Sequence, residues 1–357
     1  MSILDLVRPE LRALRGYSSA RMESGAGGVL LNANESFEPA LLGDGSVALN
    51  RYPEPQPRRL LEPLAELLDV PPDAVLLTRG SDEAIDLLTR AFCRAGNDAV
   101  LVSPPTFGMY AVCAAVQGAA LVHAPLDGAR FLWDAGSVLA AADSRVRLVF
   151  VCSPNNPTGA LVPVDSILAL ARALEGRALV VVDEAYIDYA AAPSLAREAA
   201  AGRLAVLRTL SKAHALAGAR VGALVAEPAL IAMLRRILAP YPLPTPSIDA
   251  AIAALAPQAL ARTALRIATT LAERERVAAA LRCTRGVIDV LPSRANFLLV
   301  RFDDAPAALA ILAAVGITVR DVARHEPALA SHLRISIGAP AENDALLGAL
   351  ERATVAA

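Results

Sequence analysis

Lysine is almost absent from this sequence. Of its 34 basic residues only Lys212 is a lysine, and the other 33 are arginines. The two residues replace one another at little cost on a solvated surface, but arginine stays protonated at any workable pH, whereas a desolvated lysine can lose its proton and attack a carbonyl carbon. The composition therefore makes Lys212 a candidate nucleophile, although a chance survivor on a helix face would leave the same count.

Paired cysteines, excess charge and long apolar runs are absent as well. The four cysteines are far apart and form no C-x-x-C motif, so we expect no metal site. A net charge of −2 argues against nucleic acid as a partner, because phosphate binding needs a basic face. No apolar run approaches the roughly 18 residues of a membrane span, and the N-terminus has charges where a signal peptide needs its apolar core. We therefore expect a cytoplasmic protein that binds neither membranes nor nucleic acids.

Short apolar runs recur along the chain, and helical stretches separate them. This alternation is typical of a mostly parallel sheet that helices cover on both faces. We predict an α/β fold with a mostly parallel seven-stranded sheet sandwiched by helices, plus a smaller α+β domain with strands near 296–301 and 333–337. The seven expected strands are Ala74–Thr78, Ala99–Ser103, Ala119–Ala124, Leu148–Cys152, Leu179–Val182, Leu204–Leu207 and Val221–Ala226.

The proline-rich segment 240–246 indicates a domain boundary. We divide the chain into an N-terminal arm (1–30), a large α/β domain (31–245), whose first part could pack with the small domain, and a small C-terminal α+β domain (246–357). Helices are expected at 60–68, from Ser81 as N-cap to Arg94, at 229–239, and as one long helix to about Leu281.

Polar residues follow the expected strands, where ligands of such sheets bind. Ser211, Lys212 and Arg220 follow one of them. A hydroxyl, an amine and a guanidinium suit a loop that holds a phosphorylated aldehyde, with the phosphate on Ser211 and Arg220 and the aldehyde on Lys212. The Gly80-Ser81 turn into a helix offers a further phosphate site, because N–H groups at a helix N-terminus lack acceptors within the helix.

Asp183 ends the apolar run ALVVVDEAY. A buried acid costs free energy unless it is paired, so a helix cap, an ion pair with an arginine or the protonated nitrogen of a buried heterocycle would each explain it. The last explanation fits pyridoxal phosphate, whose ring nitrogen is protonated to accept electrons from a substrate carbanion. Tyr186 and Asn156 could hydrogen-bond the ring hydroxyl, and Tyr110 could stack on the ring. An ordinary turn and a core aromatic are the plainer explanations for Asn156 and Tyr110.

Taken together, the motifs resemble those of histidinol-phosphate aminotransferases, which are fold-type I, pyridoxal-phosphate-dependent transaminases. SPNNPTG, DEAY and SK-x-x-x-L-A-G-x-R are specific for the wider aminotransferase class, whereas NRYPE, PPTFGMY and APYPL point to the histidinol-phosphate branch. The similarity covers most of the chain in the family's order. The matching stretches are NRYPE at 50–54, RGSDEAI at 79–85, PPTFGMY at 104–110, VCSPNNPTG at 151–159, DEAYI at 183–187, RTLSKAHALAGAR at 208–220, APYPLPTP at 239–246 and LRISIG at 333–338.

The resemblance implies pyridoxal 5'-phosphate as cofactor and a role for each matching residue. Lys212 would carry the cofactor as a Schiff base and shuttle the proton, and Asp183 would face the pyridine nitrogen. Asn156 and Tyr186 would face the ring hydroxyl, and Tyr110 would stack on the ring. The residues around the cofactor phosphate would be Ser81, Asp82, Ser211 and Arg220.

The resemblance also implies a substrate site that two subunits share. Tyr52 would reach the cofactor phosphate from the neighbouring subunit, which implies a homodimer. Arg334 occupies the position at which these enzymes bind the anionic end of the substrate, and Tyr17, Asn32 and Arg320 are further candidates for this task.

The implied reaction converts L-histidinol phosphate and 2-oxoglutarate into imidazole-acetol phosphate and L-glutamate. The chain departs from the family pattern at Phe107, where tyrosine is usual, and at His214, where phenylalanine is usual. An aromatic amino-acid transaminase and a threonine-phosphate decarboxylase on the same fold are the alternatives. A non-catalytic sensor with this fold is a remote alternative. Such proteins usually add a DNA-binding domain, and we expect none in this acidic chain.

Overall fold

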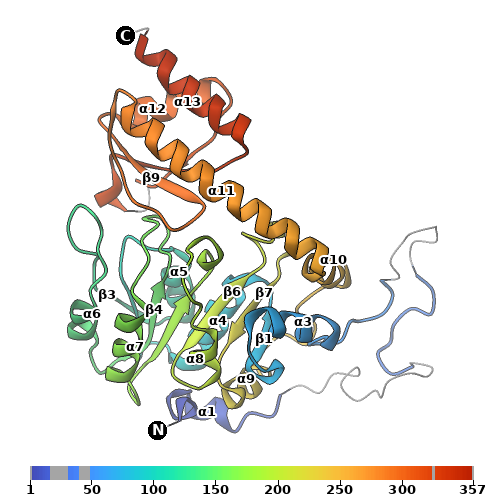
Figure 1. Ribbon diagram of the computed structural model, residues 1–357. Helices are drawn as coiled ribbons and strands as arrows, with labels where there is room; N and C mark the ends of the chain where they lie inside the picture. Colours follow the sequence, from blue (N-terminus) through green and yellow to red (C-terminus); the bar gives the residue numbers. More distant parts are fainter. Residues whose placement is uncertain (1, 17–30, 40–48, 324–325, 356–357) are drawn as a thin grey trace.

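A seven-stranded sheet forms the centre of the computed structural model, which describes residues 2–16, 31–39, 49–323 and 326–355 (Figure 1). The strand order is β1-β7-β6-β5-β4-β2-β3, and β7 alone runs against the others. Each strand falls within one residue or two of an expected one, so the prediction of a mostly parallel α/β sheet is confirmed. The strands are β1 (Val75–Thr78), β2 (Ala99–Val102), β3 (Ala120–His123), β4 (Val146–Cys152), β5 (Leu179–Asp183), β6 (Ala205–Thr209) and β7 (Gly222–Val225).

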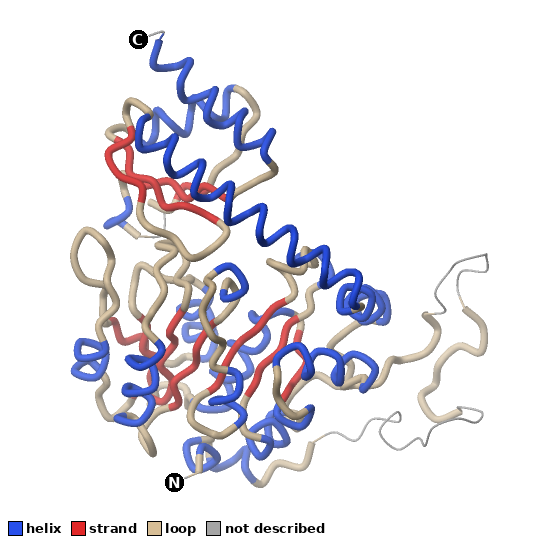
Figure 2. Tube along the Cα trace, in the orientation of Figure 1, coloured by secondary structure: helices blue, strands red, loops and turns tan. Residues whose placement is uncertain are grey.

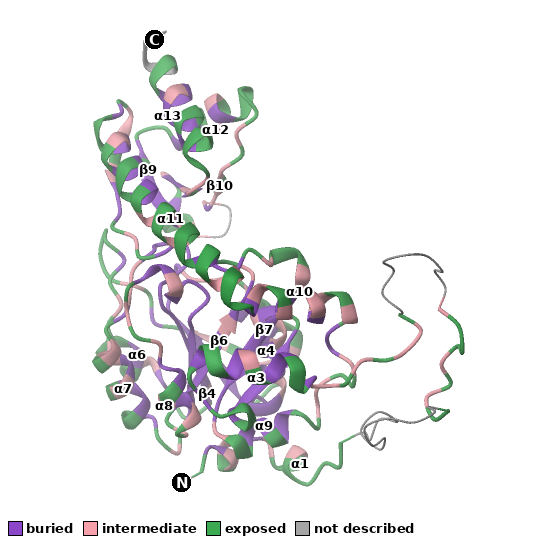
Figure 3. Ribbon diagram, turned by 45° about the vertical axis from the view of Figure 1, so that its right-hand side comes forward, coloured by how far each residue is buried: buried purple, intermediate pink, exposed green. Residues whose placement is uncertain are grey.

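Helices cover both faces of this sheet, because most of its strands are apolar on both sides. Successive strand residues point to opposite faces, so Val75 and Leu77 join one core cluster and Leu76 the other. Figure 2 shows helices on either side of the strands, and Figure 3 shows that the sheet is buried while the outer helix faces are exposed. One face packs against α3 (Arg58–Leu68), α6 (Ala135–Ala141), α7 (Val164–Ala173) and α8 (Ala196–Ala200), and the other against α4 (Gly80–Phe92), α5 (Met109–Gln117) and α9 (Pro228–Leu234).

The N-terminus of α4 differs from the expectation. The helix begins at Gly80 and Arg79 precedes it without a side-chain cap, so Ser81 is not the N-cap but lies in the first turn. Its backbone N–H there is one of those that have no acceptor within the helix. The turn therefore presents N–H donors beyond the end of β1, at the edge of the sheet where ligands bind.

Two further helices follow the sheet where one long helix was expected. Pro257 disfavours helical geometry at Ala256, whose extended backbone (φ −63°, ψ 146°) separates α10 (Thr245–Leu255) from α11 (Pro257–Cys283). Ile248 and other residues of α10 belong to the core cluster on the α3 face. Thus α10 packs with the large domain, beyond the boundary that the sequence predicted at residue 245.

The beginning of the chain also packs on the sheet domain. Ile3 and Val7 are buried in the α4 face cluster, so the first described residues of the chain lie against the large domain. The shorter elements of the described chain are η1 (Ile3–Leu6), α1 (Pro9–Arg12), η2 (Pro72–Ala74), η3 (Ile187–Tyr189), η4 (Ala217–Ala219) and η5 (Pro327–Leu329).

A smaller α+β unit completes the fold. Its strands pair antiparallel in the order β10-β11-β9-β8, and the second half of α11 packs on them with α12 (Ala305–Ala314) and α13 (Pro340–Val355). Both expected strands are present, as β9 and β11. None of the helices in the described parts of the chain is long and apolar enough to cross a membrane. The four strands are β8 (Val287–Val290), β9 (Phe297–Phe302), β10 (Arg320–Asp321) and β11 (His332–Ser336).

Gly222 allows the first turn of α4 to lie directly against β7. A Cβ atom at this position would come within 2.6 Å of the Gly80 carbonyl carbon and 2.9 Å of the Ser81 nitrogen. Overpacking of this kind costs about 1–3 kcal/mol when backbone must shift. We therefore expect Gly222→Ala to lower the free energy of unfolding in urea by about that amount. Gly108→Ala is the matched control, because a Cβ there meets no atom within 4 Å, and an equal loss in both variants would contradict this account.

Candidate active site

A cavity of about 140 Å³ lies beyond the carboxyl ends of the central strands. It brings together nine of the residues that the sequence singled out, eight predicted site residues and Phe107, from segments more than 130 positions apart. It also includes residues that the sequence did not single out, among them Cys152, Ala185, Thr209 and Ala217. The lining residues are Ser81, Asp82, Phe107, Cys152, Asn156, Asp183, Ala185, Tyr186, Thr209, Ser211, Lys212, Ala217 and Arg220.

Lys212 reaches the cavity from the loop after β6. Its Nζ lies 5.5 Å from the centre of the Tyr186 ring. The pKa of this amine is lowered, first by partial desolvation and then by the positive charge of Arg334, while Asp183 acts in the opposite direction. Because a lowered pKa increases the neutral fraction, the amine is prepared for nucleophilic or general-base chemistry.

Asp183 ends β5 and is buried at the bottom of the cavity, with 2% of its surface exposed. Its Oδ2 accepts a hydrogen bond from the Tyr110 hydroxyl (2.8 Å), and its Oδ1 accepts one from the Ala185 N–H (3.1 Å). Burial raises the pKa of this carboxyl to about 6, although both hydrogen bonds oppose the rise. Among the described residues, no basic group lies within ion-pair distance of it. A buried carboxylate without its own cation fits a ligand that brings one.

Asn156 connects the cavity to the small domain. Its Oδ1 accepts a hydrogen bond of 2.6 Å from Nη1 of Arg334, which lies on β11. Since the oxygen is engaged, the Nδ2 group remains as a donor toward a ligand oxygen. Arg334 itself lies 5.3 Å from the centre of the Phe297 ring, and its buried Nε has no partner among the described residues. The guanidinium is thus placed to bind an anion.

Backbone and side-chain donors surround the other end of the cavity. Arg220 Nη1 lies 3.4 Å from Ser211 Oγ, and its Nη2 donates to Asp82 Oδ2 at 3.2 Å. Gly80 has a φ of 74°, and a Cβ there would come within 2.6 Å of the Arg220 guanidinium. A guanidinium, a hydroxyl and the N-terminus of α4 therefore converge, which is an arrangement that suits a phosphate group.

The structure corrects the position of the stacking aromatic residue. Tyr110 is fully buried beneath the cavity, where its ring stacks on Phe150 at a centroid distance of 4.6 Å. It does not line the cavity, so it cannot stack on a ring bound there. Phe107, which stands where tyrosine is usual in the family, lines the cavity instead.

Tyr186 forms part of the cavity wall near Phe297. The two rings meet edge-to-face, with their centres 5.1 Å apart. The pKa of its hydroxyl is raised, mainly by burial. The group therefore stays protonated at neutral pH and can donate a hydrogen bond to a ligand oxygen.

The expected substrate residues are less concentrated. Arg320 lies on β10 beside Arg334 in the register of the small sheet. Tyr52 is half-exposed and stacks on Tyr241 (4.5 Å between ring centres). Neither Tyr52 nor Asn32 lines the cavity of its own chain, and Tyr17 lies outside the described residues. Figure 1 shows the described residues 31–39 away from the body of the molecule.

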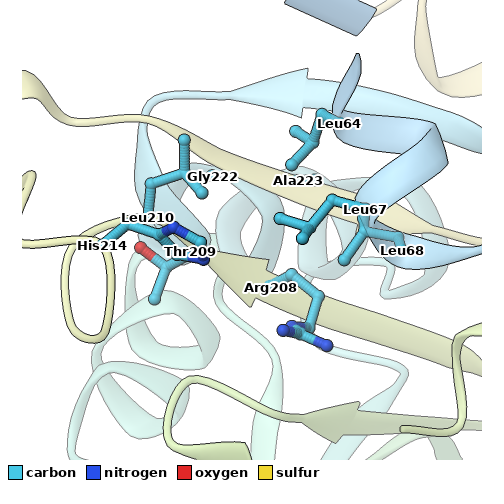
Figure 4. A pocket seen from close by; sticks show the side chains of 9 residues that line it. All are labelled: Leu64, Leu67, Leu68, Arg208, Thr209, Leu210, His214, Gly222 and Ala223. Atoms are coloured by element: carbon cyan, nitrogen blue, oxygen red, sulfur yellow. The ribbon is translucent and has the colours of Figure 1, made fainter. Parts of the chain in front are cut away.

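His214 does not line this cavity. It is buried beside a second, much smaller one of about 10 Å³, between α3 and β6 (Figure 4). This volume is too small for a substrate. The pKa of the imidazole is lowered, chiefly by burial and also by Arg208 and Arg266, while Asp188 opposes the shift. The histidine that departs from the family pattern is therefore a core residue beneath the active-site loop.

Comparison with known proteins agrees with this geometry. Residues 37–350 match the family model of class I and II aminotransferases, and the chain belongs to this family. It is 56% identical over 363 aligned positions to a histidinol-phosphate aminotransferase of Stenotrophomonas maltophilia, covering 99% of this chain and 98% of that protein. It is 52% identical to the enzyme of that name from Xanthomonas campestris, over all of this chain and 99% of the relative.

A solved structure of a histidinol-phosphate aminotransferase from Sinorhizobium meliloti, in complex with pyridoxal-5'-phosphate, has the same fold. The TM-score is 0.77 at 28% identity, and the superposition covers 86% of this chain and 84% of that one. The fold class that the sequence predicted is confirmed, and the chain is an aminotransferase.

The lowered pKa of His214 predicts a pH-dependent stability. Below about pH 6.5 this imidazole is protonated in the unfolded chain but not in the folded chain. The free energy of unfolding therefore decreases as the pH falls, by at most about 1.4 kcal/mol per pH unit. His214→Phe removes this dependence. We expect the free energy of unfolding of the variant, relative to the unchanged chain, to increase between about pH 7.5 and about pH 5.5 in urea denaturation. A difference that stays constant over this range would refute the assignment, and His123→Phe, at an exposed histidine, is the control.

Proposed function

We propose that this chain transfers the amino group of L-histidinol phosphate to 2-oxoglutarate, giving imidazole-acetol phosphate and L-glutamate, with pyridoxal 5'-phosphate as cofactor. The observation that carries the proposal is the pairing of Lys212 with Asp183 across one cavity. The lysine is the chain's only primary side-chain amine, and the aspartate is a buried anion with no basic group of the described chain at ion-pair distance. The full-length similarity to histidinol-phosphate aminotransferases supports the choice of substrate.

The residues of the cavity fit each part of this cofactor. Asp183 would hold the protonated ring nitrogen, Nδ2 of Asn156 and the Tyr186 hydroxyl would donate to the phenolic oxygen, and Phe107 would cover one ring face. The phosphate would be held by the hydroxyls of Ser81 and Ser211, the Arg220 guanidinium and the backbone N–H groups of Ser81 and Asp82 at the N-terminus of α4. When bound, the cofactor supplies a carbonyl that forms a covalent bond to an amine and an electron-poor ring that stabilises negative charge at the substrate α-carbon.

Lys212 would perform the proton transfer. Its lowered pKa means that a neutral amine is available to take a proton from the substrate α-carbon, and the same nitrogen can return that proton to another carbon within its reach. Arginine cannot do this, because its guanidinium is not deprotonated in proteins. The replacement of every other lysine by arginine therefore stops at the one position where amine chemistry is needed.

Arg334 would bind the anionic end of the substrate. Its guanidinium is half-buried, and burial lowers its pKa while Tyr186 opposes the shift. An anion beside it would compensate the desolvated charge. Because Arg334 also donates to Asn156, substrate binding and the hydrogen bond to the cofactor oxygen would share one side chain. Arg320, Asn32 and Tyr17 remain further candidates for the same task.

We further propose a homodimer in which Tyr52 completes the site of the partner subunit. The described segments before α3 expose large apolar side chains, at 88% for Leu31 and 87% for Phe37. Apolar groups exposed to this extent on an extended segment are typical of an interface. A cytoplasmic location likewise remains a prediction.

Lys212→Arg tests the catalytic assignment. We expect turnover to fall by at least about 1000-fold, while circular dichroism and the urea midpoint stay near those of the unchanged chain. Borohydride reduction of the loaded protein should fix the cofactor on one peptide, which contains residue 212, since no other lysine exists. The control is Lys212→Arg combined with Arg58→Lys at an exposed position, which restores the lysine count but not the activity. Turnover in either variant would reject Lys212 as the nucleophile.

Steady-state kinetics on three donors test the substrate. With 2-oxoglutarate as acceptor, kcat/KM for L-histidinol phosphate should exceed that for L-phenylalanine by at least about 100-fold, because a phosphate reaches further and offers more charge and more acceptor oxygens to the guanidinium than the shorter carboxylate of phenylalanine does. L-Threonine phosphate, which also carries a phosphate, should give no loss of carbon dioxide. A preference for phenylalanine, or release of carbon dioxide, would replace the proposed reaction by one of the alternatives.

A further inference from the structure

The contacts beneath Asp183 indicate how the chain keeps this carboxyl group ionised. Within the described parts of the chain, two hydrogen bonds reach it, from the Tyr110 hydroxyl to Oδ2 and from the Ala185 N–H to Oδ1. The second comes from the backbone and every residue type except proline would supply it. The first depends on one side chain, which the sequence had assigned to a different task.

The position of the Tyr110 hydroxyl is fixed by packing on all sides. Tyr110 lies in the first turn of α5 and has no exposed surface. Its ring is stacked on Phe150 with an interplanar angle of 5°, and Phe107 meets it edge-on with ring centres 5.6 Å apart. A phenol held in this way keeps its hydroxyl beside Asp183, although the Cys152 thiol also interacts with it, so the hydrogen bond to Asp183 is pre-organised.

The other titratable groups around the carboxylate do not replace this donor. The thiol of Cys152 on β4 and the Tyr186 hydroxyl have raised pKa values because they are buried, and Tyr110 does as well. These groups are therefore neutral. Asp82 on α4 has a like charge and disfavours the anion, whereas Lys212 favours it weakly. Tyr110 is thus the side chain that donates directly to Asp183.

We propose that Tyr110 is a positioning residue for the cofactor: its hydroxyl occupies Oδ2 of Asp183 and so keeps this carboxylate anionic and oriented toward the cavity. The inference rests on the proposed function, because the ligand that uses the anion is the protonated ring nitrogen. Tyr110 itself touches neither cofactor nor substrate. It acts through Asp183 alone.

Tyr110→Phe tests this role, because it removes one oxygen and keeps the ring on Phe150. The readout is the dissociation constant of pyridoxal 5'-phosphate from the whole apoprotein, measured by fluorescence against pH. Binding requires ionised Asp183, so affinity falls as the pH drops below the point at which this carboxyl takes a proton. We call this fall in affinity at low pH the acid limb of the binding curve. Loss of the donor should shift the acid limb to a pH about one unit higher, which is the change expected from a hydrogen bond to a charged group.

Two matched variants separate this effect from others. Asp183→Asn should abolish the limb that belongs to the carboxyl and leave only the titration of the cofactor phosphate, and adding Tyr110→Phe to it should change nothing further. Tyr189→Phe removes the hydroxyl of another buried tyrosine that does not line the cavity, and its acid limb should stay in place. A carbocyclic analogue of the cofactor, with CH instead of the ring nitrogen, should bind better as the pH falls, because it has no cation to offer the carboxylate.

The outcomes distinguish this inference from the proposed function. If the unchanged chain binds no pyridoxal 5'-phosphate, the proposed function fails. If it binds and the acid limb of Tyr110→Phe coincides with that of the unchanged chain, or moves equally in the Asp183→Asn background, the role of Tyr110 is overturned. Urea unfolding establishes that the variant is folded. If Tyr110→Phe does not fold, Phe150→Leu takes its place, because this change loosens the packing of the Tyr110 ring but keeps the hydroxyl. The acid limb should then move in the same direction by a smaller amount. An acid limb that does not move overturns the role of Tyr110.

Discussion

A single buried negative charge organises this active site. Asp183 lies at the end of the central strand β5, almost without exposed surface, and burial raises its pKa to about 6. A carboxylate in such a place costs free energy unless donors or a cation compensate it. The chain supplies two donors and, within its described part, no cation at ion-pair distance. The remaining compensation must come from the ligand, which is why the site selects a heterocycle with a protonated nitrogen.

The opposite end of the ligand is selected by close packing of backbone. Gly222 on β7 and Gly80 at the first position of α4 leave no room for a side chain, so the helix N-terminus and the Arg220 guanidinium approach the same point. Strand β7 runs against its neighbours and pairs with both β1 and β6. This pairing brings the segment after β1 beside the loop after β6, and a phosphate site forms from residues 130 positions apart. The cofactor would be held between this site and Asp183, with Lys212 between them.

The small domain contributes to the site through the hydrogen bond from Arg334 to Asn156. The guanidinium that is placed to bind the substrate anion also fixes the amide that would face the cofactor oxygen. A movement of the small domain would therefore change both contacts together. Such coupling offers a physical route by which the arrival of an anionic substrate is sensed at the cofactor ring.

The sequence alone determined the sheet, the cofactor class and most of the cavity. Apolar runs must form strands that are buried on both faces, and residues that follow parallel strands must meet at one edge of the sheet, so Lys212, Asp183, Asn156 and Ser81 could be brought together without coordinates. Tertiary packing alone decided between Phe107 and Tyr110: they are three positions apart in one motif, but one precedes α5 and faces the cavity while the other is turned into the core. Tertiary packing also decided that α10 joins the large domain, because the apolar face of α10 packs against α3 and not against the small sheet. Both outcomes depend on which surface a side chain meets, and that is a property of the folded chain that no local pattern contains.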